Sequence, residues 1–93
     1  MKHIALIKLA SGADAVKVQE KLYKAYKKLD EELDWVNHPV VTRSCAKSDM
    51  DLMATVDIDG EEQLDEYMAN AHLKKLKESL EDKIEKVIWF NHY

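Results

Sequence analysis

The amino-acid sequence predicts an α+β fold, in which a four-stranded antiparallel sheet carries helices on one of its faces. Two observations predict it. Strand-like and helical segments follow one another in the order strand, helix, strand, strand, helix, strand. In addition, the first strand-like segment is apolar at both its odd and its even positions, so that both faces of the sheet need a cover.

The first strand is predicted over residues 3–9, HIALIKL, and a helix follows it. One face of this strand would carry His3, Ala5, Ile7 and Leu9, and the other would carry Ile4, Leu6 and Lys8. Ser11 and Asp14 then have the spacing of a capping box, in which Ser11 accepts a hydrogen bond from a free amide of the first turn. The helix is predicted because apolar residues recur at steps of three and four, namely Ala15, Val18, Leu22, Ala25, Leu29 and Leu33.

Two more strands follow this helix. Residues 38–46, HPVVTRSCA, are predicted to form a strand because they include a run of β-branched residues. Pro39 cannot donate to a strand ladder and so belongs at the start of an edge strand. KSDM forms a polar turn, and residues 51–58, DLMATVDI, form the third strand. Alternation would place four apolar residues of that strand on one face, namely Leu52, Ala54, Val56 and Ile58.

The second helical region is predicted to be broken. Asp59 and Glu62 repeat the capping-box spacing, and helical periodicity continues through EEQLDEYM. After Asn70 and Ala71 a new apolar stripe begins, formed by Leu73, Leu76, Leu80, Ile84 and Val87. The chain closes with VIWFNHY, a β-branched and aromatic strand.

This order of elements is the ferredoxin-like, or split βαβ, arrangement. Its helices cover one face of the sheet, while the other face also carries apolar residues. The economical cover for that second face is another copy of the chain, with the two sheets packed face to face in a homodimeric α/β barrel.

Composition sets limits on the protein class. The 93 residues are expected to form one domain, residues 1–93. With 14 Lys and Arg against 18 Asp and Glu, the net charge is −4 and no basic stripe exists, which argues against a nucleic-acid partner. The apolar stretch IALI is far too short for a membrane span or a signal peptide, which argues against a membrane partner. The single Cys45 excludes an internal disulfide and is expected to be a half-buried thiol of a reduced, cytoplasmic protein.

Three stretches of the sequence resemble the stress-responsive α/β-barrel (Dabb) family. They are KHIALIKL at the start, MDLMATVDIDGEEQLDEY across the third strand and second helix, and AHLKKL before the last strand. The family usually writes the helix break as Tyr-x-x-His-Pro-x-His. Here Tyr67 is present and His72 fits the final histidine, but Asn70 replaces the first histidine, the proline is missing and the spacing is one residue short. The resemblance implies a homodimeric ferredoxin-like barrel without implying a single activity.

Some Dabb members are similar to cofactor-free polyketide cyclases, and this suggests one set of site residues. A cyclisation needs a base to remove a proton α to a carbonyl and a donor for the enolate oxygen. By this resemblance His72 would be the base and Tyr67 the donor. His3 would be a further polar group in the same cavity, and Tyr23 and Tyr26 would line the pocket from the first helix.

The same residues have structural interpretations. Tyr67 could be a core tyrosine on the apolar stripe of the second helix. Asn70, which is also a candidate ligand-binding residue, and His72 could end one helix and cap the next. The residues therefore leave open whether the protein is an enzyme, or whether its barrel only holds a small apolar or aromatic ligand or is filled by its own side chains.

Other classes of site find less support. Asp49, Asp51, Asp57 and Asp59 flank the third strand but would lie in pairs at its two ends, where solvated carboxylates are common. We therefore expect no metal site and no cofactor. Monooxygenases of the antibiotic-biosynthesis type, including haem-degrading ones, share the dimeric barrel. Four residues invite that comparison without forming a motif, namely Trp35, Trp89, Phe90 and Asn91.

Overall fold

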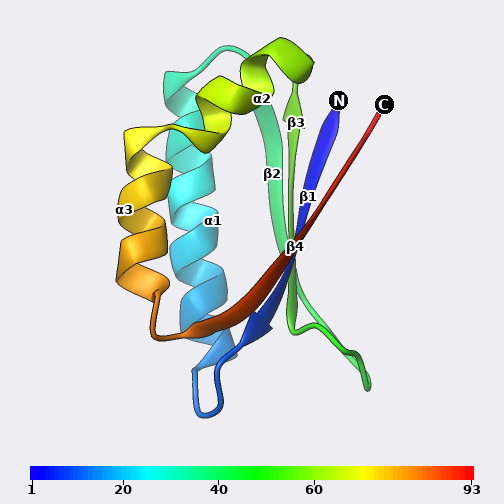
Figure 1. Cartoon of the computed structure of the whole chain (residues 1–93), viewed down its shortest axis with the longest axis vertical. Coiled ribbons are helices and arrows are strands. Elements are labelled where there is room, and N and C mark those ends of the chain that lie inside the picture. Colours follow the sequence, from blue (N-terminus) through cyan, green and yellow to red (C-terminus); the bar gives the residue numbers. More distant parts are fainter.

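The computed structural model describes residues 1–93 and confirms the ferredoxin-like fold (Figure 1). Its elements are β1 (Lys2–Leu9), α1 (Ala15–Glu32), β2 (Val36–Arg43), β3 (Leu52–Ile58), α2 (Glu61–Met68), α3 (Ala71–Leu80) and β4 (Ile84–His92). The strands form one antiparallel sheet in the order β2-β3-β1-β4. All three helices lie on the same side of this sheet, and its other side is bare (Figure 1).

The covered face of the sheet holds the hydrophobic core. Ala5 of β1 is paired with Ala54 of β3 on one side and with Trp89 of β4 on the other, so these residues share a face. The odd-numbered residues of β1 point at the helices, and Ala5 and Ile7 are each only 3% exposed. From α1 the predicted stripe packs onto this face, with Val18, Leu22 and Leu29 fully buried.

The bare face carries the even-numbered residues of β1 and their partners. Ile4 lies between Thr55 and Phe90, and Leu6 lies between Met53 and Ile88. The apolar side chains left exposed here include Val40, Met53, Ile88 and Phe90. We call this surface the open face, defined by Ile4, Leu6, Val40, Met53, Ile88 and Phe90.

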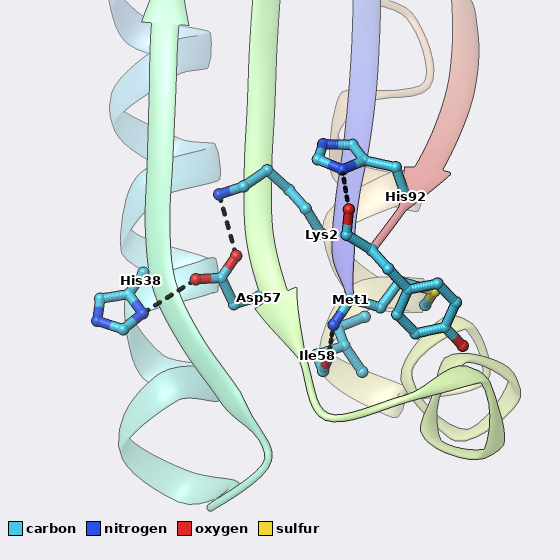
Figure 2. A network of polar contacts seen from close by, with 7 residues as sticks. Met1, Lys2, His38, Asp57, Ile58 and His92 are labelled. Carbon is cyan, nitrogen blue, oxygen red and sulfur yellow. Dashed lines mark hydrogen bonds and ion pairs between the residues drawn. The ribbon is translucent and has the colours of Figure 1, made fainter.

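Charged side chains border the open face where the two chain ends lie (Figure 2). Lys2 Nζ lies 3.0 Å from one carboxylate oxygen of Asp57, and His38 Nδ1 lies 3.1 Å from the other. The terminal amino group of Met1 donates to the carbonyl oxygen of Ile58 at 2.7 Å. These contacts hold the start of β1 against the end of β3.

The helix boundaries correct two of the predicted caps. Asp14, and not Ser11, is the N-cap of α1, because its side chain accepts from the amides of Val16 and Lys17. Gly60 is the N-cap of α2 and has no side chain, so the proposed Asp59–Glu62 box does not form. The break itself is confirmed, since Asn70 caps α3 by accepting from the amide of His72 at 2.8 Å.

The segment between β2 and β3 also differs from prediction. β2 ends at Arg43, so Cys45 lies in the connecting loop and is exposed, not half-buried in a strand. β2 is an edge strand as Pro39 predicted, but Pro39 lies within it, at an irregularity of the ladder between Asn37 and Val40. His38 in this irregularity has a φ of 54°, a left-handed conformation that few non-glycine residues adopt.

Candidate functional site

A cavity of about 350 Å³ lies between the helices and the sheet. Its floor is formed by β1 and β4, through Ala5, Ile7, Ile84, Val87 and Trp89, and its walls by the three helices. Of the 14 lining residues 12 are hydrophobic, so the cavity has an apolar interior. Its volume lies at the lower end of the ~300–1,000 Å³ that small-molecule sites span.

Two tyrosines from different helices meet at this cavity. Tyr26 of α1 and Tyr67 of α2 both line it and are both buried. Burial raises the pKa of Tyr26 to about 12, although the neighbouring Tyr67 hydroxyl lowers it in part. Burial also raises the pKa of Tyr67, and the neighbouring Tyr26 raises it further. Both phenols therefore keep their protons at neutral pH, and each can act as a donor at the cavity.

His3 is packed against two residues of the cavity wall. Its ring stacks on Trp89, with centroids 5.2 Å apart, and meets Tyr67 edge-on at 5.4 Å. The ring is only 4% exposed, and its Nδ1 lies 2.5 Å from Oδ1 of Asn91. Nδ1–H therefore donates to Asn91, while the buried Nε2 has no hydrogen-bond partner.

The charge state of His3 follows from this environment. Burial lowers its pKa below 6.5, the bond to Asn91 opposes this shift, and the nearby positive charge of Lys77 lowers the pKa again. A neutral imidazole that donates through Nδ1 carries a lone pair on Nε2. An unpartnered buried acceptor is costly, roughly 1–3 kcal/mol, so it is a position where a ligand donor would be stabilising.

The structure brings only some of the predicted residues together. Tyr26 and Tyr67 line the cavity and His3 contacts its wall. His72 does not line it: its Nε2 lies 3.2 Å from Glu32 at the end of α1, and its side chain is 43% exposed. Asn70 serves as the α3 cap, and Tyr23 is exposed at 44% on α1, so neither reaches the cavity.

Three contributing residues were not predicted as a site. Lys77 and Trp89 line the cavity, and Asn91 orients His3. A register argument could have found Asn91, because an antiparallel β1–β4 pair places it opposite His3. Lys77 directly follows Leu76, which belongs to the apolar stripe of α3. Its contact with the Trp89 ring depends on where β4 lies in the fold, and the sequence alone does not indicate it.

Comparison with known proteins identifies the fold. No protein-family model matches the sequence, and no curated protein resembles it at a significant level. Among solved structures, a dimeric ferredoxin-like protein of unknown function from Bacteroides fragilis matches with a TM-score of 0.79 and 14% identity, covering 98% of this chain and 94% of that one. A Dabb family protein with a ferredoxin-like fold from Mesorhizobium loti matches with a TM-score of 0.71 and 19% identity, covering 99% and 93%.

This chain has a ferredoxin-like fold. The same fold also occurs in a Deinococcus radiodurans protein provisionally named an antibiotic biosynthesis monooxygenase, with a TM-score of 0.71, 13% identity and 99% and 90% coverage. Identities this low establish a shared fold and leave the activity to the site itself. None of the helices has the length and apolar character needed to cross a membrane.

Proposed function

We propose that this chain is a Dabb-type protein that acts as a homodimer and binds a small apolar or aromatic molecule in the cavity between its helices and its sheet. The cavity carries the proposal, because about 350 Å³ of apolar space is kept open in a chain of 93 residues. Protein interiors are normally close-packed, and voids larger than a water molecule are few. The dimeric ferredoxin-like structures and the open face support the homodimer. A cytosolic location and a role in stress remain predictions.

A cavity-filling variant tests the binding function. Ala5→Leu adds three carbon atoms at the floor of the cavity, where Ala5 is buried between Ala54 and Trp89. We expect a small aromatic probe such as indole to shift the amide NMR signals of α3 and β4 in the unmodified protein and not in Ala5→Leu. Ala71→Leu, on the exposed side of α3, is the matched control that should still bind. Identical shifts in both variants would place the probe elsewhere and contradict the proposal.

A cofactor-independent enzyme is the second candidate function, and the unpartnered Nε2 of His3 favours it. If a substrate reaches His3 past Tyr67 and Trp89, the neutral histidine can remove a proton α to a carbonyl, and Tyr26 can donate to the enolate oxygen that forms. In this interpretation His3 takes the role that the sequence suggested for His72. The two assignments of the base, His3 and His72, predict different effects of substitution on proton exchange at the α-carbon.

Deuterium exchange separates the two histidines. With 1-phenyl-1,3-butanedione as an enolisable probe in D₂O, the protein should accelerate exchange at the α-carbon if it is an enzyme of this kind. His3→Gln should abolish the acceleration while His72→Ala retains it. The opposite result would restore the base role of His72, and no acceleration by the unmodified protein would favour binding alone.

A further inference from the structure

The mouth of the cavity carries one positive and one negative side chain. Lys77 and Glu81 are its only charged lining residues. Lys77 Nζ lies 5.3 Å from the centroid of the Trp89 ring, a cation–π contact that holds the ammonium beside the cavity. Lys77 takes part in no ion pair, so the N–H donors of its ammonium are not engaged by a carboxylate.

The two charged residues are one helical turn apart in sequence. Lys77 contacts Trp89 of β4. Glu81 lies one turn later, at the end of α3, and β4 begins three residues after it at Ile84. One turn is about 5.4 Å along a helix. The cation–π contact places the positive charge beside Trp89, and the negative charge of Glu81 lies one turn nearer the end of α3.

The polar groups near Lys77 also favour one kind of head group. Tyr26 also lines the cavity and keeps its hydroxyl proton, and Lys77 is the only positively charged side chain among the lining residues. The Tyr26 hydroxyl and the Lys77 ammonium are both hydrogen-bond donors, and only the ammonium is charged. This combination suits a ligand head group that accepts hydrogen bonds and carries one negative charge. A phosphate dianion would need more positive charge than the one lysine supplies.

Building on the binding function proposed above, we propose that the occupant is an apolar carboxylic acid. Its carboxylate binds Lys77 beside Trp89, and its apolar body fills the cavity against Leu76 and Leu80. Lys77 thus sets the charge specificity of the site, while the cavity sets the size of the apolar body.

A matched pair of probes tests this specificity. 4-Phenylbutyrate and 4-phenyl-1-butanol share one apolar body and differ in the head group. By calorimetric titration at pH 7.5 and low salt, the acid should bind roughly 5–10-fold more tightly than the alcohol, the size of a favourable, partly exposed ion pair. The preference should weaken in high salt, because salt screens exposed charges.

Variants of α3 assign the preference to one residue. Lys77→Met keeps an apolar stem of similar length and removes the charge, so acid and alcohol should bind equally. Lys77→Arg should retain the preference, and so should Lys75→Met, an exposed lysine that does not line the cavity. Circular dichroism confirms that each variant folds, which is expected because both lysines are exposed.

The outcomes separate this inference from the binding function. Equal affinities of the two probes for the unmodified protein, or a preference that survives in Lys77→Met, would overturn carboxylate selection and leave ligand binding intact. Binding of neither probe would overturn both proposals.

Discussion

The two faces of the sheet both carry apolar residues but differ in how far those residues are buried. On the covered face, apolar strand residues such as Ile7 and Val56 are at most 3% exposed beneath the helices. On the open face, Val40 and Phe90, which are equally apolar, remain 50% and 60% exposed. A contiguous apolar surface of this kind usually marks an interaction site. The chain therefore buries one apolar face of its sheet by itself, and the homodimer proposed above would cover the other.

The covered face is itself divided into a packed and a hollow part. α1 lies close on β2 and β3, and Leu29 in this part is 0% exposed. Beside α3 the layer opens into the cavity, where the rings of Tyr26, Tyr67 and Trp89 form part of the wall. The α1 side of this layer is therefore closely packed, whereas the α3 side contains the cavity.

The largest expected effect is on the open face. Phe90→Glu places a charge in the apolar surface that a second copy would cover. We expect the dissociation constant of the dimer to rise by at least ~30-fold, since loss of a buried aromatic contact typically costs about 2–4 kcal/mol. Sedimentation velocity across a concentration series measures the change.

The control for this prediction is an aromatic residue on the helical side. Tyr23 is 44% exposed on α1, and Tyr23→Glu should leave the dimer intact. An unmodified protein that sediments as a folded monomer at micromolar concentration would show that the open face needs no partner copy.

The second prediction compares the packed and hollow parts of the covered face. Leu29→Ala removes atoms from a fully packed position and should lower the free energy of unfolding by about 3–5 kcal/mol. Leu76→Ala enlarges a cavity that already exists, so fewer contacts are lost and we expect about 1–2 kcal/mol. Urea denaturation gives both values, and equal losses would mean that the cavity wall is as tightly packed as the α1 interface.

Sequence patterns predicted the framework of the fold and part of the site. The Leu22–Leu29 stripe and the alternation in β1 depend on local periodicity, which is visible in the residues themselves. The Asp14 cap was missed because Ser11 and Asp14 are both good N-cap residues, and only the backbone path of the turn decides between them. Tyr67 was predicted as a site residue through the family resemblance. It lies on the buried side of α2.

The remaining site features depend on distances between elements far apart in the sequence. His3 and Asn91 are 88 residues apart and meet only through the β1–β4 register. His72 was expected at the site from its place after the helix break, but α3 turns it outward to Glu32. No local pattern indicates which side of a capped helix start will face a cavity, so its role as a base remains a prediction for the exchange experiment.

The third prediction concerns acid sensitivity of the covered face. His3 has a folded-state pKa below 6.5, so between that pKa and 6.5 the unfolded chain binds more protons than the folded one. Stability contributed by neutral His3 is thus fully present above pH 6.5 and is lost as the pH falls through this window. Thermal unfolding between pH 7.5 and 5 should show a steeper decline for the unmodified protein than for His3→Phe. His92→Phe, at an exposed position, should decline like the unmodified protein.

The smallest effect is expected at the charged border of the open face. Lys2 lowers the pKa of Asp57 mainly through its hydrogen bond, and His38 contributes to the same direction. Stability from ionised Asp57 is therefore present above pH 4 and is lost as the pH falls through the lowered pKa. Because Asp57 and Lys2 are both about 40% exposed in the single chain, Asp57→Asn should cost only a few tenths of a kcal/mol at pH 7.

Protein concentration makes this small effect informative about the two faces. If a second copy covers the open face, water is excluded from the Lys2–Asp57 pair, and removing one partner leaves a buried lysine charge uncompensated. The cost of Asp57→Asn should then grow as concentration drives dimerisation, whereas Asp59→Asn, at an exposed carboxylate without an ion pair, should stay neutral at every concentration. A cost of Asp57→Asn that does not change with concentration would mean that the border stays in water, and that any second copy binds only the apolar centre of the open face.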